Sequence, residues 1–180
     1  NNIFSGTYSV TATDANGCDA NLDILVTEPD DFDIIQTIET LSCNGDQDGF
    51  IILNVFGGTS PYSFLWEDGS QNDSRFNLGA GTYVTTISDF NGCSVEVSTD
   101  LTEPAVLDLS NVTLEHPVCD GDSNGFITVS PMGGTSGYEY SWSNGETTQT
   151  ISGLNEGEYM LTVTDSEGCI ITNTYTLTDQ

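Results

Sequence analysis

The chain has 180 residues, of which 36% are apolar, so it can line one large core or two small ones. Its 28 Asp and Glu residues are opposed by a single basic residue, Arg75, which gives a formal net charge of −27 at pH 7. This charge excludes nucleic-acid binding, which requires Lys and Arg to neutralise phosphates, and it excludes electrostatic docking on anionic lipid.

The first residues of the chain predict two strands joined by a tight turn. Alternate positions are apolar from Tyr8 to Ala12 and again from Ala20 to Val26. A period of two is typical of half-buried strands, and the Asn-Gly pair between the two segments is a hairpin signal. No apolar run approaches the roughly 18 to 20 residues of a membrane helix, so we expect no membrane insertion.

The next part of the chain predicts six strands with the same period of two. Turn signals separate them, namely the double glycine at 57–58 and the pairs Asp68-Gly69 and Asn91-Gly92. The strands are expected at 33–42, 50–56, 62–66, 73–78, 82–88 and 94–102. No window shows the apolar stripe of a helix, and short strands with turns every 8 to 12 residues or so are typical of an all-β sandwich.

The same pattern then returns, because the chain is built of repeats with a period of 75 or 76 residues. The turn Asp-x-x-Gly-Cys ends at Cys18, Cys93 and Cys169, and an acidic loop begins at Cys43 and again at Cys119. We therefore expect three parts: the C-terminal strands of a truncated repeat at 1–29, a complete repeat at 30–104, and a second complete repeat at 105–180.

Two further marks favour an immunoglobulin-like sandwich. Trp66 and Trp142 fall on the third strand of each complete repeat. The spacing Leu-x-x-Gly-x-Tyr, which ends at Tyr83 and Tyr159, is typical of a tyrosine corner at the start of the penultimate strand. The predicted fold class is all-β, with tandem immunoglobulin-like β-sandwich repeats of about 75 residues.

The order of these motifs resembles the SprB repeat. The string runs Cys-Asn-Gly-x-x-Asp-Gly-x-Ile, Gly-Gly-Thr-x-Pro-Tyr-x-x-x-Trp, Leu-x-x-Gly-x-Tyr-x-x-x-x-x-Asp-x-x-Gly-Cys and Thr-Glu-Pro, and it covers nearly all of both complete repeats. The later repeat departs from it at Gly137, which replaces proline, and Arg75 stands where the later repeat has Ile151. The resemblance implies a long surface adhesin of gliding bacteria, exported by the type IX secretion system to the cell exterior.

Five cysteines in an acidic chain are better explained by disulfides in an oxidising compartment than by catalysis or zinc. Two schemes fit the spacing: bonds within a repeat leave Cys18 unpaired, whereas bonds 18–43 and 93–119 leave Cys169 unpaired. Six strands that alternate in direction would put the acidic loop and the cysteine turn of one repeat at the same end. We therefore predict the pairs Cys43–Cys93 and Cys119–Cys169, because a disulfide needs Cα atoms within about 7 Å.

The two acidic loops match the first half of an EF-hand calcium loop, in which alternate oxygens point inward and a glycine permits the turn. The twelfth position holds Val55 or Pro131 instead of a bidentate Glu, so each site needs a further donor from elsewhere. The predicted calcium ligands are Asn44, Asp46, Asp48 and Asp89 in one repeat and Asp120, Asp122, Asn124 and Asp165 in the other. The alternative is a solvated β-turn, because Asn, Asp and Gly are good turn formers.

Catalysis is not expected, since the chain has no Lys, its single histidine is His116, and no carboxylate pair stands out by spacing. The leading hypothesis is a structural spacer of a secreted surface adhesin that serves gliding motility and attachment. Calcium and disulfides would stiffen it, and its partners would be neighbouring repeats of the same chain. The alternative is a carbohydrate-binding module of a secreted polysaccharide-active protein, with Tyr62, Tyr138 and Phe90 as candidate contacts for surface polysaccharide.

Overall fold

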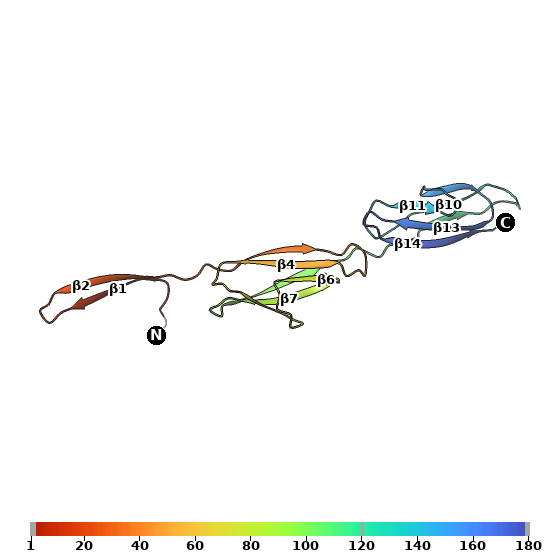
Figure 1. The fold of residues 1–180 in the computed structure, drawn as a ribbon. Helices are drawn as coiled ribbons and strands as arrows, with labels where there is room; N and C mark the ends of the chain where they lie inside the picture. The colour runs from red at the N-terminus through yellow and green to blue at the C-terminus, as the bar shows by residue number, and fades with distance from the viewer. Residues whose placement is uncertain (1–2, 120, 179–180) are drawn as a thin grey trace. The chain divides into compact units, whose positions relative to one another are not determined.

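Strands and connecting loops make up the computed structural model, which describes residues 3–119 and 121–178 (Figure 1). Within these two ranges the regular elements are the strands β1 to β14, and no helix has the length and hydropathy needed to cross a membrane. Asp120, one of the predicted calcium ligands, lies outside the described residues.

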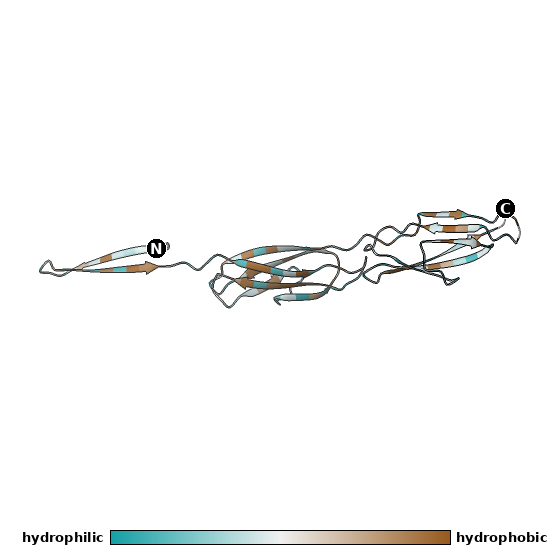
Figure 2. Cartoon of the chain, turned by 90° about the horizontal axis from the view of Figure 1, so that it is seen from above, coloured by the Kyte–Doolittle hydropathy of each residue, from teal (hydrophilic) through white to brown (hydrophobic). Residues whose placement is uncertain are grey.

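The first two strands form an antiparallel hairpin, β1 (Gly6–Thr13) with β2 (Asp19–Val26). Tyr8 lies opposite Ile24 and Val10 lies opposite Leu22, so these four apolar side chains share one face of the sheet. Figure 2 shows hydrophobic segments interspersed with more polar ones along both strands of the hairpin. They are between 37% and 62% exposed. The face that the sequence pattern predicts to be buried is therefore open to solvent in this hairpin.

The next six strands form two three-stranded sheets, with strand orders β3-β4-β6 and β5-β7-β8. Their bounds are β3 (Asp33–Glu39), β4 (Gly49–Phe56), β5 (Ser63–Trp66), β6 (Ser74–Leu78), β7 (Gly81–Ser88) and β8 (Ser94–Leu101). These bounds confirm the six predicted strands to within three residues at each end. Arg75 lies opposite Ile51, just as Ile151 lies opposite Ile127, so the basic residue leaves the register unchanged.

The last six strands repeat this arrangement, with strand orders β12-β10-β9 and β11-β13-β14. Their bounds are β9 (Val112–Glu115), β10 (Gly125–Val129), β11 (Glu139–Trp142), β12 (Thr150–Leu154), β13 (Gly157–Thr164) and β14 (Ile170–Leu177). The buried cluster between the sheets comprises Leu109, Ile127, Val129, Trp142, Ile151, Leu154, Leu161, Val163, Tyr175 and Leu177. Because these side chains come from both sheets, the six strands form a β-sandwich around one core, as predicted.

Both immunoglobulin-like marks are present. Trp66 and Trp142 are 2% and 3% exposed, and each indole N–H donates to a backbone carbonyl six residues later, at 2.8 and 2.9 Å. The Tyr83 and Tyr159 hydroxyls donate to the carbonyl four residues earlier, at 2.9 and 3.1 Å, which is the hydrogen bond of a tyrosine corner. The chain is thus a tandem array of immunoglobulin-like sandwich repeats.

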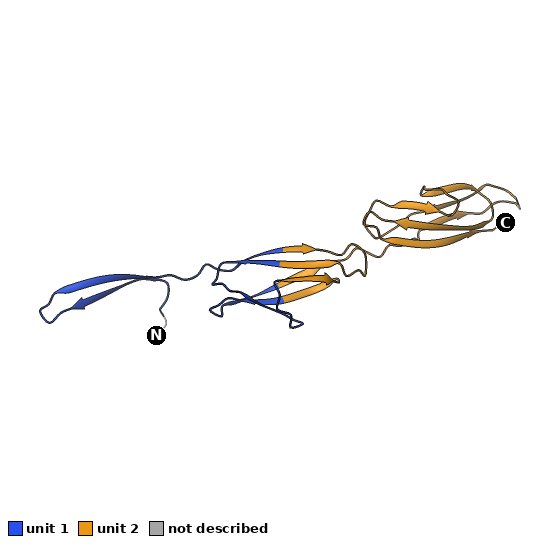
Figure 3. Cartoon of the chain, in the orientation of Figure 1, with its two compact units in different colours: residues 1–36, 53–73, 85–97 blue, residues 37–52, 74–84, 98–180 orange. Residues whose placement is uncertain are grey.

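The chain divides into two compact units (Figure 3). One comprises residues 1–36, 53–73 and 85–97, and the other comprises residues 37–52, 74–84 and 98–180. The division runs through residues 30–104 and does not follow the predicted repeat boundaries, which stay a prediction. The second unit contains the loop of Cys43 and all of residues 105–180.

Candidate functional site

Two cysteines of the second unit, far apart in sequence, are joined by a disulfide bond. Cys43, between β3 and β4, bonds Cys169, between β13 and β14, across 126 residues and with a Cα–Cα distance of 5.7 Å. That distance lies in the usual range for a disulfide. Cys18, Cys93 and Cys119 are free and exposed. The predicted pairs Cys43–Cys93 and Cys119–Cys169 are therefore wrong.

The prediction failed because the six strands of a repeat do not alternate strictly in direction. In residues 105–180, β13 starts three residues after β12 ends and runs back along the sandwich, and β11 is antiparallel to β13. β11 and β12 therefore run in the same direction, because both run opposite to β13. The connection at 143–149 thus crosses from one sheet to the other without reversing the direction of the chain.

This crossing puts the loop of Cys119 and the turn of Cys169 at opposite ends of the sandwich. The loop leads into Gly125, which lies opposite Leu154. β13 leaves that end at Gly157 and reaches the turn only after its eight residues, or about 26 Å of strand. A bond between Cys119 and Cys169 would need Cα atoms within about 7 Å.

The loop of Cys43 is closed by its own polar groups. The Asp46 N–H donates to the Cys43 carbonyl at 3.2 Å, and the Ser42 N–H donates to the Asp48 carboxylate at 3.3 Å. Hydrogen bonding from the Ser42 side chain, and to a lesser extent from its backbone N–H, holds the pKa of Asp48 below its ordinary value.

Hydrogen bonds also tie this loop to the segment that leads out of β8. The Asn44 side-chain amide donates to the Pro104 carbonyl at 3.0 Å, and the Gly45 N–H donates to the Glu103 carboxylate at 2.7 Å. The Thr-Glu-Pro motif therefore supplies acceptors to the cysteine loop, a role that the sequence pattern alone did not reveal.

Asp165 organises the turn that presents Cys169. Asp165 is 4% exposed, and its carboxylate accepts hydrogen bonds from the backbone N–H groups of Glu167 at 3.0 Å, Cys169 at 2.9 Å and Thr135 at 2.7 Å. Burial raises the pKa of Asp165, but these hydrogen bonds outweigh burial and hold the pKa below its ordinary value. The carboxylate is thus an internal cap of the turn.

The double glycine before Thr135 makes this contact possible. Gly133 and Gly134 have φ of +72° and +58°, in the region that favours glycine. A Cβ at Gly133 would lie 1.9 Å from the Val106 carbonyl oxygen, and one at Gly134 would lie 2.6 Å from the Asp165 carboxylate. Only glycine lets the backbone approach both groups this closely.

The predicted calcium ligands are not assembled as expected in residues 105–180. Asp165 serves its own turn, at the opposite end from the loop that contains Asp122 and Asn124, and the Asn124 side-chain oxygen accepts the Val118 N–H at 3.2 Å. Asp89 is 7% exposed and accepts from the N–H groups of Asn91 and Cys93 in its own turn and of Thr59 in the Gly-Gly-Thr segment. The described residues contain no group of three or more His, Cys, Asp or Glu placed to hold a metal ion. Calcium binding by the loop oxygens stays a prediction.

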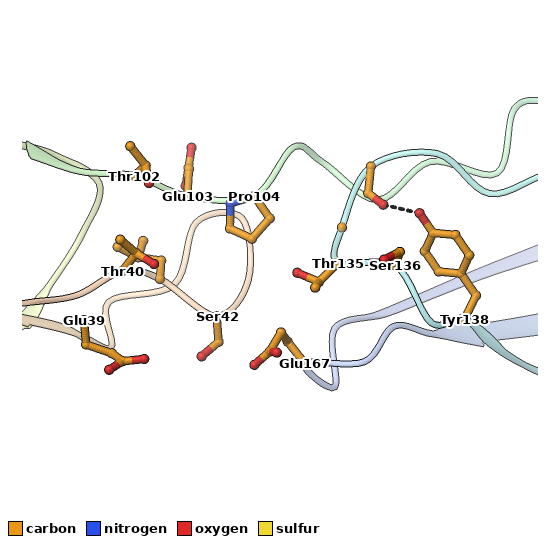
Figure 4. Close-up of a pocket in the computed structure, with 13 residues that line it drawn as sticks. Glu39, Thr40, Ser42, Thr102, Glu103, Pro104, Thr135, Ser136, Tyr138 and Glu167 are labelled. Carbon is orange, nitrogen blue, oxygen red and sulfur yellow. Dashed lines mark hydrogen bonds between the residues drawn. The ribbon is translucent and has the colours of Figure 1, made fainter.

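A polar pocket of 720 Å³ is lined by residues that lie close in sequence to both bonded cysteines (Figure 4). Ser42 directly precedes Cys43, and Glu167 stands two residues before Cys169. Both line the pocket, together with Glu39 and Glu103. The Tyr138 hydroxyl donates to the Gly133 carbonyl at 2.6 Å and so belongs to the frame of the pocket.

The three aromatic candidates for carbohydrate contact, Tyr62, Tyr138 and Phe90, differ in exposure. The Tyr62 hydroxyl donates to the Gly57 carbonyl, as Tyr138 does to Gly133, and both rings are half-buried. Phe90 is 71% exposed. The two tyrosines therefore brace the glycine turns of the fold.

Comparison with known proteins identifies the repeats. The SprB repeat model matches residues 35–71 and 111–147, which confirms the resemblance at these two places. A search of curated proteins finds no match.

Several solved structures match this chain at low sequence identity. The eight N-terminal Ig domains of Down syndrome cell adhesion molecule match with 14% identity and a TM-score of 0.49, over 98% of this chain and 28% of that one. A C-terminal fragment of intimin, solved with the intimin-binding domain of its translocated receptor, matches with 14% identity and a TM-score of 0.43, over 81% and 64%. Ig domains 1–5 of Sidekick-1 match with 13% identity and a TM-score of 0.41, over 98% and 46%. The chain therefore spans between 28% and 64% of these structures.

Proposed function

We propose that this chain, which carries two matches to the SprB repeat, is a non-enzymatic spacer segment of a long bacterial surface adhesin. The repeat and the immunoglobulin-like sandwich are both of an adhesin type, and a structural disulfide belongs to an oxidising compartment such as the cell exterior. The spacer holds a distant adhesive part away from the envelope in gliding motility and attachment, after export by the type IX system.

The observation that carries the proposal is the bond between Cys43 and Cys169. A force applied to the two ends of the chain passes through the sulfur bridge and bypasses the 126-residue stretch that the bond closes. The strands β4 to β13 all lie within this closed ring. A spacer that transmits traction benefits from this arrangement, because the load cannot extend the sheets inside the ring.

Single-molecule force spectroscopy tests this function. With the disulfide intact, the residues between Cys43 and Cys169 should add nothing to the contour length of the unfolded chain. Reduction should release a further length on the order of 400 Å, from 126 residues at roughly 3.3–3.6 Å each. Cys43→Ser should show the long extension without reductant, and Cys93→Ser should behave like the parent. Equal contour lengths before and after reduction would contradict the proposal.

Two measurements address location and the competing function. Antibody against the chain should label intact cells that make it, whereas labelling only after lysis would overturn the surface assignment. Retention of the folded chain on polysaccharide beads, lost in Phe90→Ala, would favour a carbohydrate-binding module over a spacer.

A further inference from the structure

The free cysteines Cys18 and Cys93 lie in turns with the same geometry as the turn of bonded Cys169. In each turn an aspartate four residues earlier donates its N–H to the cysteine carbonyl, at 3.0, 2.9 and 3.0 Å, and accepts the cysteine N–H at 2.9 Å. The backbone of the turn is therefore held by the same hydrogen bonds whether or not its cysteine is bonded.

The loop of free Cys119 likewise resembles the loop of bonded Cys43. An Asp N–H three residues later donates to the cysteine carbonyl, at 3.0 Å for Cys119 and 3.2 Å for Cys43. The N–H before each cysteine donates to a side-chain oxygen six residues later, of Asn124 at 3.2 Å and of Asp48 at 3.3 Å. The same two hydrogen bonds therefore close both loops, the bonded one and the free one.

We propose that the observed bond is one instance of a general joint, in which the loop cysteine of each repeat bonds the turn cysteine of the repeat that follows. By this rule Cys119 takes the turn cysteine of a repeat placed after residue 180. Cys93 and Cys18 take loop cysteines of repeats placed before them. The inference goes beyond the spacer function and does not rest on it, because it follows from the one bond and the repeat period.

The joint forms by thiol–disulfide exchange with a small-molecule disulfide such as oxidised glutathione. One protein thiolate attacks it, forms a mixed disulfide and releases one glutathione thiol. The second protein thiolate then attacks the mixed disulfide and releases the second glutathione thiol. The two protein thiols lose two protons and two electrons, and the electrons reduce the glutathione disulfide. Cys93 and Cys119 are exposed and therefore accessible to this exchange.

A consequence of the rule is that successive rings overlap. The ring closed by Cys43 and Cys169 contains Cys119, where the next ring would begin before the first has ended. Every stretch of an array built this way would lie within at least one ring. The covalent joints would then limit extension along the whole array.

An extended chain tests the rule directly. A copy of residues 105–180 is appended after residue 180, and the protein is oxidised in a glutathione buffer and mapped by non-reducing peptide mass spectrometry. We expect a peptide that links Cys119 to the copied turn cysteine. The number of titratable thiols should stay at three, as in the parent chain, because Cys119 becomes bonded while the copied loop cysteine adds one free thiol. In the Cys119→Ser version the copied turn cysteine should be free, while Cys43–Cys169 persists.

A second extended chain tests the same rule at the other end and does not depend on how the first copy folds. A copy of residues 30–104 replaces residues 1–29, and its loop cysteine should bond Cys93. Cys93→Ser is the matched control. Folding of either copy is read from hydrogen exchange of its strands. The rule is overturned if a folded copy leaves Cys119 or Cys93 open to alkylation, or if the copied cysteines bond within their own repeat.

Discussion

The carboxylate of Asp165 accepts a 2.7 Å hydrogen bond from the backbone N–H of Thr135, thirty residues earlier in the chain. Asp89 makes the same contact with Thr59 at 3.0 Å. Each aspartate thereby fastens the Gly-Gly-Thr segment to the cysteine turn. The acidic residue that the sequence predicted as a metal donor is a structural cap at both positions.

Asp165→Asn should destabilise the chain. The amide keeps the shape of the side chain, but its nitrogen cannot accept, so at least one buried backbone N–H loses its partner at a cost of about 1–3 kcal/mol. The free energy of unfolding from urea titration measures the loss. Glu156→Gln removes the same charge at an exposed position and should change stability little; equal losses in the two variants would assign the effect to charge alone.

The contribution of Asp165 should depend on pH in the acid range. Its pKa is lower in the folded chain than the ordinary value of 3.8, so its stabilisation is complete above about pH 3.8 and is lost as pH falls through the folded-state pKa. The difference in unfolding free energy between the parent and Asp165→Asn should therefore shrink as the pH falls below about 3.8. Asp14, Asp48 and Asp108 also have lowered pKa values, and taking the difference removes their common effect. A difference that is constant across this range would refute the assignment.

Cys43→Ser should release Cys169 as one additional reactive thiol. Alkylation without reductant, followed by mass spectrometry, reports the change against the three thiols of the parent. Cys119→Ser should leave the Cys43–Cys169 bond intact. Had Cys119–Cys169 been the native pair, that second variant would instead free Cys169.

Leu161→Ala should destabilise the sandwich of residues 105–180 strongly. Leu161 is fully buried in the core, and replacing a buried leucine by alanine costs about 2–5 kcal/mol. Met160, its neighbour on β13, is 49% exposed, so Met160→Ala should cost much less. Similar losses measured by chemical denaturation would show that the assignment of the two faces of β13 is wrong.

Calcium binding by the acidic loops predicts a melting temperature that is several degrees higher in calcium than in EDTA. A bound cation would offset the mutual repulsion in a chain of net charge −27, and binding to the folded state alone raises stability. Asp122→Asn should reduce the shift, and Glu156→Gln should not. Coincident melting curves in calcium and EDTA would exclude the sites.

Local patterns were sufficient to locate the strands. Alternation such as that of Tyr159, Leu161 and Val163 reflects one buried face, and the glycine pairs mark turns that only a few residues can form. The largest error was the end of the strand at 33–42, since β3 stops at Glu39. There the Leu41 N–H donates to the Thr102 carbonyl, and the chain enters the cysteine loop.

The candidate site was less accessible to prediction. The sequence identified the right loop and the right turn, because the cysteines and aspartates recur in them. Asp165 was predicted as a metal ligand because the residue type alone does not show whether a carboxylate binds a cation or accepts hydrogen bonds from three backbone N–H groups. The Asp-to-Cys spacing of four, present in all three turns, is the signal that could have indicated a cap.

The sequence by itself determined the all-β class, the repeat period, the strands and the tyrosine corners, because each depends on residues close together in the chain. The partner of Cys43 was decided only by the tertiary structure. Which end of a sandwich a cysteine occupies depends on whether each connection folds back or crosses to the other sheet. That choice is made by packing between the sheets, and no short stretch of residues records it.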